Sequence, residues 1–376
     1  MDPLPRSTTD PTIVAPVGAK PVLRVRSLAD LIALVPVILG FEPRESLVIA
    51  TIAGRFTGFS VRVDLPPPSR PDLVRLLAQH VSAAACTQQC TRVAVMAFSD
   101  DPARAREVAE VLDVVADRLA VDGVEVTDVL RIGQGRYWSL RCAEAACCPP
   151  EGTVYDARST QLRADATLAG IAVAPGREAL AARLAAVGGE RARAMQAATT
   201  LAEQDVLRTL GLRGRRSLLR PPRRVLRLAA DHGAARVDRL LDRLLDSGAG
   251  IDGPVRDADA AALAVWCSIL CLRDLAWSRI DRPHARQHLA LWSNISRLVV
   301  APYEPAVVCL AGFAAWLSGD GASAWCAIER VEAVDPHYSM AGLLRDALER
   351  CVPPDVWEPL PRELVLPRGW SASRET

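Results

Sequence analysis

The stretch RVAVMAFSDDPARAREVAEVLDVVADRLAVDGVEVTDVLRI, residues 92–132, decides the fold class of this chain. Arg92–Phe98 is an apolar run with the length of a strand, and Val124–Ile132 is a second β-rich run. Between them, Asp101 followed by Pro102 predicts the start of a helix, because aspartate caps a first helical turn and proline is tolerated in it. A strand, a helix and a second strand in this order predict parallel strands in an α/β sheet.

The segments before this unit predict the remaining parts of the same sheet. Val22–Arg26 has the pattern of a short strand, and Ser27 is the predicted N-cap of an apolar helix over Leu28–Leu39. Leu47–Ile52 and Phe59–Leu65 are β-rich runs joined by a connection with a glycine at each end, which predicts an antiparallel hairpin. A parallel pair combined with an antiparallel hairpin makes a mixed sheet.

The second half of the chain has a helical pattern. Segments rich in Ala, Leu and Arg follow one another and are separated by proline and glycine breaks. We therefore expect a two-domain α+β protein, with an α/β domain at residues 22–156 and an all-helical domain at residues 157–352. Residues 1–21 are proline-rich and contain no apolar stretch of the kind found in signal peptides. We therefore expect a disordered lead and no signal peptide. Residues 353–376 are expected to form a Pro-rich tail.

Composition limits the classes of function. Of the 376 residues, 50% are hydrophobic and 24% charged, and the formal net charge of +1 gives no basic excess of the kind that nucleic-acid binding requires. The arginine-rich run Arg213–Arg224 is therefore interpreted as a solvated linker, with contact to nucleic acid or an acidic partner as the alternative. The apolar runs Leu31–Phe41 and Ala306–Leu317 are shorter than the roughly 18–20 residues of a bilayer span. We expect a soluble, cytoplasmic protein.

A repeat-like unit lies near the C-terminus. The stretch GDGASAWCAIERVEAVDP from Gly319 resembles the second half of a tetratricopeptide repeat, with Gly319 and Asp320 at the turn between two helices. Ala324 and Gly312 then occupy positions where the two helices approach closely. Because a solenoid needs about three such units and only one is recognised, we expect a single packed helical hairpin. A peptide-binding groove is the alternative.

Three tracts together resemble a known family. They are LGFEPRESLV at 39–48 with RVDLP at 62–66, GRYWSLRCAEAACCPPEG at 135–152, and WLSGDGASAWCAIERVEAVDPHYSMAGLL at 316–344. Over about residues 22–354 the chain is similar to the family known as domain of unknown function 4192, which is common in high-GC Gram-positive (actinobacterial) species. The resemblance implies kinship and no particular activity.

Polar residues near the predicted strands are candidates for a pocket. Arg44 and Ser46 precede one strand of the hairpin and Asp64 ends the other, so an ion pair between Arg44 and Asp64 is the simpler expectation. The alternative is a pocket for an anionic ligand with Arg44 as a bidentate donor. Asp100 follows the carboxyl end of an apolar strand, where open α/β sheets bind ligands, and Trp138 could add an aromatic wall.

Three cysteines, Cys142, Cys147 and Cys148, lie within seven residues. Three thiolates can bind zinc, and a fourth ligand could come from Cys86, Cys90 or His80. However, successive side chains of an extended segment point to opposite sides, which separates Cys147 from Cys148. We therefore expect no cofactor, and a packed loop of reduced thiols that connects the two domains and fixes their angle. Zinc binding and a redox role, with Cys142 paired to either of the others, are the alternatives.

No standard catalytic motif is present. The loop that follows the apolar run Arg92–Phe98 contains neither GxGxxG nor the P-loop pattern, and the sequence contains no GxSxG, so we expect no dinucleotide, P-loop or nucleophile-elbow site. The favoured hypothesis is a non-catalytic binding or scaffold protein, in which the α/β domain holds a ligand or partner and the helical domain contacts a protein partner. The alternative is an enzyme with its site near Arg44, Ser46, Asp64 and the Tyr137–Cys148 segment.

Overall fold

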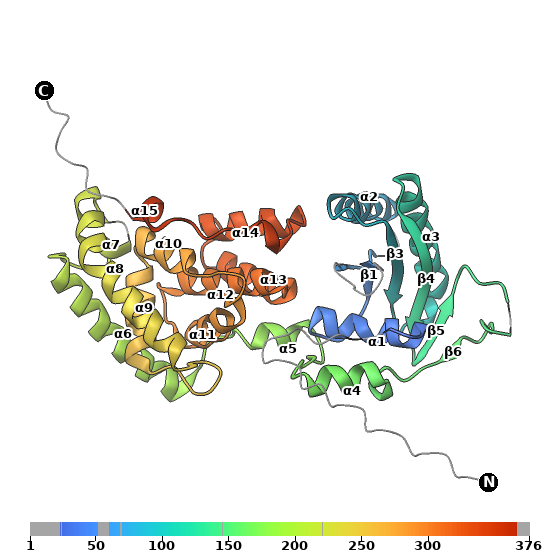
Figure 1. The fold of residues 1–376 in the computed structure, drawn as a ribbon, viewed down its shortest axis with the longest axis horizontal. Coiled ribbons are helices and arrows are strands. Elements are labelled where there is room, and N and C mark those ends of the chain that lie inside the picture. Colours follow the sequence, from blue (N-terminus) through green and yellow to red (C-terminus); the bar gives the residue numbers. More distant parts are fainter. Residues whose placement is uncertain are drawn as a thin grey trace, which may run out of the picture.

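The computed structural model describes residues 23–366 except residues 24, 52–59, 68–69, 145 and 220. These residues form a sheet-containing half and a helical half (Figure 1). The sheet has the strand order β2-β1-β3-β4-β5-β6. The strands are β1 (Ser46–Thr51), β2 (Ser60–Asp64), β3 (Arg92–Phe98), β4 (Glu125–Gly133), β5 (Arg136–Ser139) and β6 (Thr153–Val154). Strands β3 and β4 are parallel and the other neighbouring pairs are antiparallel, so the predicted mixed sheet and antiparallel hairpin are confirmed.

Two helices cover one face of the sheet. Helix α3 (Ala105–Val121) connects the parallel strands, and α2 (Pro71–Thr87) lies beside it. The Asp101 carboxylate accepts a hydrogen bond from the Ala103 N–H at 2.9 Å and caps the short 3-10 turn η1 (Pro102–Arg104) before α3. The predicted helix start is confirmed. Apolar side chains of α2, α3 and the strands form one buried cluster on this face.

Helix α1 (Leu28–Leu39) covers the other face and is itself covered. Its first turn is capped by Ser27, whose Oγ accepts from the Asp30 N–H at 3.1 Å, and it ends at Gly40 with a left-handed φ of 75°. Leu31, Ile32 and Val35 belong to the cluster that includes this face of the sheet. On another side of α1, Ala33, Leu34 and Val37 pack against α4 (Gln161–Leu168). Burial on both sides requires the nearly uniform apolar sequence of this helix.

The strand predicted at Val22–Arg26 is wrong for its described residues. Residues 23, 25 and 26 are not in a strand, and the other two lie outside the described part. The Arg26 N–H donates to the Asp30 carboxylate at 3.0 Å, so the backbone here pairs with the first turn of α1. The sheet has instead a short last strand, β6, which lies next to β5 at one end of the strand order.

The segment at residues 157–174 packs on the sheet-containing half. It holds the short turn η2 (Ala157–Ser159) and α4, and its end is bonded to the residues after α1. The Ala174 N–H donates to the Gly40 carbonyl at 2.8 Å, and the Glu42 N–H donates to the Ala174 carbonyl at 2.9 Å. We therefore expect any domain boundary after Ala174. The division into two domains stays a prediction, since one large apolar cluster extends from the sheet into the helical half.

The helical half is built around α12, which is buried along almost its whole length. The helices after residue 175 are α5 (Arg177–Ala182), α6 (Gly189–Thr209), α7 (Arg216–Leu219), α8 (Arg223–Asp246), α9 (Asp257–Cys267), α10 (Leu270–Ser278), α11 (Ala285–Leu298), α12 (Glu304–Ser318), α13 (Gly321–Val334), α14 (Ser339–Glu349) and α15 (Arg362–Val365), with the 3-10 turn η3 (Pro354–Val356). Among the described helices, none is by itself long and apolar enough to cross a bilayer. The pair α9 and α10 passes that test only together and is bent by 113°.

The predicted solvated linker and the predicted Pro-rich tail are both anchored by specific contacts. Within the arginine-rich run, Arg215 forms a 2.7 Å ion pair with the buried Glu203, which also accepts from the Tyr303 hydroxyl at 2.9 Å. In the tail, the Trp357 ring stacks on Trp277 with a centroid distance of 5.2 Å. Residues 353–366 therefore dock on the helical half, and the rest of the tail, like residues 1–21, lies outside the described residues.

Helices α12 and α13 form a tight hairpin. Gly319 makes the turn between them with a left-handed φ of 87°. A Cβ atom at Gly312 would lie 2.8 Å from the Ala327 Cβ and 3.1 Å from Leu344 of α14. Ala324 has no exposed surface, and its carbonyl oxygen would lie 3.6 Å from the same Cβ. The predicted close contact at Gly312 and Ala324 is thus present, and it leaves no room for a larger side chain.

We expect the substitution Ala324→Leu to overpack this contact. It should lower the free energy of unfolding by about 1–3 kcal/mol, because added methylenes force a packed core to shift. Denaturant-induced unfolding measures the change. The matched control is Ala194→Leu on the exposed face of α6, which should change stability by less than about 0.5 kcal/mol. Equal stability of the two variants would contradict a tight α12–α13 contact.

Candidate functional site

A cavity of about 570 Å³ opens where the two parallel strands end. Phe98 and Ile132, at the carboxyl ends of β3 and β4, contribute to its lining together with Ile32 and Pro36 of α1. The loop at residues 155–158 forms another part of the wall. The carboxyl edge of parallel strands is where open α/β sheets bind ligands, because side chains and loops from neighbouring strands converge there. This cavity is therefore the candidate site.

The loops that follow β3 and β4 are bonded to each other. The Ser99 N–H donates to the Ile132 carbonyl at 2.9 Å, and a Cβ at Gly133 would lie only 2.0 Å from the Ser99 carbonyl oxygen. The Asp100 carboxylate accepts from the Gln134 N–H at 2.7 Å, and the Gln134 amide donates back to the Asp100 carbonyl at 3.1 Å. These bonds hold Asp100 in the cavity wall.

Glu45 connects β1 to the other side of the cavity. Its φ of 42° is left-handed, a conformation uncommon for a residue with a side chain. Its carboxylate accepts from the Ser99 Oγ at 2.8 Å and pairs with Arg104 at 2.5 Å. The pKa of Arg104 is raised above its usual value, mainly because the guanidinium donates a hydrogen bond to Glu107. Glu45 is not among the residues predicted for the pocket, because its partner Arg104 is 59 residues away and no local signal relates them.

Two arginines line the cavity without an ion-pair partner among the described residues. They are Arg44 and Arg158, and both are exposed. The nearby carboxylate of Glu42 is already paired with Arg163 at 3.0 Å. One oxygen of Asp156 accepts from the Arg158 backbone N–H at 2.9 Å. The two guanidinium groups are thus available to an anion.

Tyr155 supplies a neutral polar group to the same cavity. Burial raises the pKa of Tyr155 to about 12, and the negative charges of Glu42, Asp100 and Asp156 add to this effect. The phenol therefore keeps its proton near neutral pH and can donate a hydrogen bond. Its ring also packs edge-on against Tyr137 of β5, with a centroid distance of 6.0 Å, which fixes its position.

Of the five residues predicted for the pocket, only Arg44 and Asp100 line this cavity. Ser46 is buried, where its Oγ donates to the Arg44 carbonyl at 2.7 Å and accepts from Arg62 at 2.8 Å. Asp64 pairs with Arg62 at 2.6 Å, so the predicted Arg44–Asp64 ion pair is wrong. The reason is that residues two apart in a strand lie on the same face. Asp64 lines a second cavity.

Trp138 lies outside the cavity and holds the loop between β5 and β6. The Arg131 guanidinium lies 3.5 Å from the centre of its ring, in a cation–π contact. The indole N–H donates to the Pro150 carbonyl at 3.1 Å. A Cβ at Gly152, which has a φ of 82°, would lie 2.5 Å from the ring, so the chain passes close against the indole. Trp138 therefore ties together the two ends of the cysteine-bearing loop.

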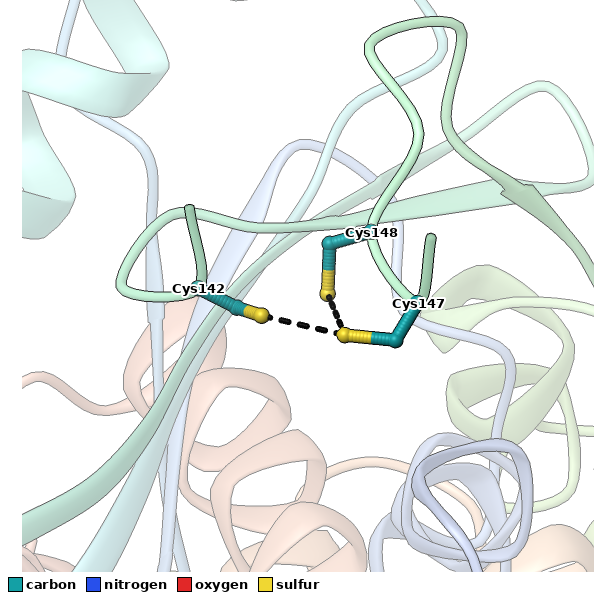
Figure 2. Close-up of side chains that lie close together, drawn as sticks. All are labelled: Cys142, Cys147 and Cys148. Carbon is teal, nitrogen blue, oxygen red and sulfur yellow. Dashed lines mark hydrogen bonds between the residues drawn. The ribbon is translucent and has the colours of Figure 1, made fainter. Parts of the chain in front are cut away.

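The three cysteines of that loop point toward one another (Figure 2). The Sγ atoms of Cys142 and Cys147 are 3.2 Å apart, and those of Cys147 and Cys148 are 3.5 Å apart. The backbone N–H groups of Cys147 and Cys148 both donate to the Glu144 carbonyl, at 3.2 and 2.8 Å. The segment is a turn, so the prediction that adjacent cysteines diverge is wrong: that argument holds for extended chain only.

The environment of the thiols also differs from the prediction. Cys147 is exposed and the other two are partly exposed, and β5 and β6 lie at the end of the sheet away from the helical half (Figure 1). The cysteines therefore do not bury themselves between two domains. Hydrogen bonds from Cys147 and Cys148 lower the pKa of the Cys142 thiol, whereas the hydrogen bond to Cys142 raises that of Cys148 to about 12. Among the described residues, none of Cys86, Cys90 and His80 joins the group.

Replacement of Gly133 by Ala should open the candidate site. The new Cβ would collide with the Ser99 backbone, which cannot rotate away as a side chain could. We expect a loss of about 1–3 kcal/mol in the free energy of unfolding. The matched control is Gly342→Ala in α14, where a Cβ meets nothing within 4 Å and helix propensity should add up to about 1 kcal/mol. A Gly133→Ala protein as stable as wild type would show that the loops are not held this closely.

Comparison with known proteins identifies the family of this chain. The family model described as "Domain of unknown function (DUF4192)" matches residues 29–355. Neither the curated proteins nor the solved structures gave a match. The matched region includes α1, the whole sheet, the candidate cavity and the helices up to η3. Because one model covers most of the chain, this protein belongs to the DUF4192 family.

Proposed function

We propose that this protein binds a small anionic molecule in the cavity at the ends of β3 and β4. The observation that carries the proposal is the position of Arg44 and Arg158, which line the cavity and have no ion pair among the described residues. A guanidinium group presents its N–H donors in a planar fork that matches the oxygens of a carboxylate or phosphate. An anion here would supply the partners that these two side chains lack.

The remaining wall suggests the rest of the ligand. A volume of about 570 Å³ is within the usual range for small-molecule pockets. Ile32, Pro36 and Phe98 offer an apolar surface, the Tyr155 phenol offers a donor, and the Asp100 carboxylate offers an acceptor. We therefore favour a ligand that carries an anionic group together with a hydroxyl or amine, on a small carbon skeleton.

We favour binding over catalysis as the role of this site. The residues named for the enzyme alternative are dispersed: Ser46 is buried and hydrogen-bonded, Asp64 faces a different cavity, and Trp138 holds a loop. Catalysis needs a nucleophile or base and its partners within reach of one reacting atom. Conversion of a bound ligand would favour the enzyme alternative. We also propose a cytoplasmic location, on the basis of sequence composition alone.

Loss of Arg44 tests the proposed ligand site. Screening of phosphorylated and carboxylated metabolites by thermal shift should find stabilising ligands, and isothermal titration gives their affinity. Arg44→Ala should weaken binding about tenfold to a hundredfold, because hydrogen bonds to charged groups contribute about 1.5–3 kcal/mol. Arg75→Ala, an exposed arginine on α2, is the matched control and should bind as wild type does. Equal loss in both variants, or none in Arg44→Ala, would rule out this pocket.

A second candidate role, binding of an extended protein segment, is favoured by the outer edge of β2. This edge strand lines a cavity of about 660 Å³ opposite Trp316 of α12 and Trp325 of α13. Leu65, just after β2, donates its N–H to the Glu45 carbonyl, so alternation places the Asp64 N–H on the outer edge. An exposed edge can accept a partner's strand. The resemblance of the neighbouring hairpin to a repeat that contacts proteins agrees with this role.

Substitution at Asp64 separates edge pairing from other modes of binding. Peptides selected from a display library against the whole protein should lose binding to Asp64→Pro, because proline removes the outward N–H of an edge strand. Asp64→Ala is the matched control: it keeps the N–H and should retain binding within a few-fold. Peptides that bind Asp64→Pro as well as wild type would show that β2 does not pair with them.

A further inference from the structure

We propose that Cys142, Cys147 and Cys148 bind one Zn²⁺ ion, with the fourth coordination position open to solvent. The three Sγ atoms lie within 4.8 Å of one another, and two of the separations are 3.2 and 3.5 Å. Tetrahedral zinc with Zn–S bonds of about 2.3 Å places its sulfur ligands about 3.8 Å apart. The thiols are therefore close to the spacing of a zinc site, and small side-chain movements would complete it (Figure 2).

Exposure argues against a packing role for these thiols. Unpaired cysteines are usually buried and act as small apolar side chains, as Cys267 and Cys309 do in the helical half. Cys147 is exposed, and Cys142 and Cys148 are only partly covered. Burial therefore contributes little to holding three sulfur atoms together in this loop. A shared ligand accounts for their convergence.

The backbone of the loop preorganises the thiols. The Glu144 carbonyl accepts the N–H groups of both Cys147 and Cys148, which turns two successive side chains toward the same side. At the base of the loop, Arg136 donates to the Gly152 carbonyl at 2.8 Å, and the Trp138 indole donates to Pro150. Because the turn exists before the ion binds, less conformational entropy is lost on binding.

The ligand set selects the kind of metal. Thiolates are soft ligands that prefer ions such as Zn²⁺ over Mg²⁺ or Ca²⁺, which take oxygen ligands. Each thiol loses its proton to the solvent as it forms a bond to zinc, so affinity should rise with pH. No other His, Cys, Asp or Glu of the described residues joins the group. The fourth position is then left to water, an arrangement found in zinc sites that exchange a ligand.

Metal content of the whole protein tests the site. Protein purified without chelator and under reducing conditions should contain about one zinc per chain by elemental analysis. Replacement of zinc by Co²⁺ should give a thiolate charge-transfer band and the intense visible bands of tetrahedral cobalt. Cys147→Ser should lose both zinc and these bands. Cys86→Ser, which changes an exposed cysteine outside the group, is the matched control and should keep them.

Three results would overturn the proposal. The first is reduced wild-type protein that takes up no zinc from a competing chromophoric chelator. The second is equal zinc in the Cys147→Ser and Cys86→Ser proteins, which would place the metal elsewhere. The third is a count of free thiols two short of ten, with mass spectrometry locating a disulfide at Cys142 and Cys147. Circular dichroism checks that Cys147→Ser is folded. If it is not folded, wild-type protein is treated with a chelator in place of the variant. The chelator should remove zinc from the zinc-containing protein and abolish the visible bands of the cobalt-containing protein.

Discussion

Burial of α1 on two sides is the constraint on which the other layers depend. Its sequence has almost no polar position, so a sheet on one side alone would leave Leu34 and Val37 in water. At roughly 25 cal/mol per Å² of apolar surface, that exposure would be costly. The chain therefore returns after β6 as α4 to cover the second side. The left-handed Gly40 then turns the chain so that Arg44 and Glu45, just before β1, lie beside the cavity.

The cavity and the cysteine loop belong to one sheet but are held in different ways. The cavity lies where two parallel strands end together, and its wall is fixed by bonds between distant segments, such as Glu45 with Ser99 and Arg104. The cysteine loop leaves and re-enters the sheet between two short antiparallel strands, and the Trp138 indole fixes its base. The first arrangement suits a ligand that enters from solvent between several loops. The second suits an ion bound by one short segment.

The helical half depends on small side chains at close contacts. Gly312 and Ala324 let α12 and α13 approach, and α14 packs on both helices, with Leu344 next to Gly312. The same half faces the sheet across the second cavity, where the side-chain amide of Gln88, just after α2, donates to the Cys351 carbonyl of the helical half. This hydrogen bond is a polar contact between the halves, and one apolar cluster also extends from the sheet into the helical half and includes Leu180 of α5. The relation of the halves thus rests on both kinds of contact.

The sequence by itself determined most of the elements and the class of fold. Ser27 and Asp101 cap helices, Gly40 ends one, and the alternation of apolar residues separates strands from helices, because each of these interactions joins residues close together in the chain. It also drew attention to the three cysteines and to Arg44 and Asp100. The strand expected at Val22–Arg26 was the main error of this kind, since whether a short apolar run joins a sheet depends on its neighbours.

Only the tertiary structure decided which polar residues meet. Arg62 of β2 donates to Ser46 of the neighbouring strand, and Glu45 finds Arg104 from 59 residues away, because register and loop path bring these residues together. Trp138 faces the cysteine loop and not the cavity for the same reason. The orientation of Cys147 and Cys148 is a local exception: it depends on the Glu144 carbonyl, a backbone acceptor close in the chain, in a turn that the residue pattern does not indicate. Local pattern determines which residues form an element, whereas long-range packing determines which side chains share a site.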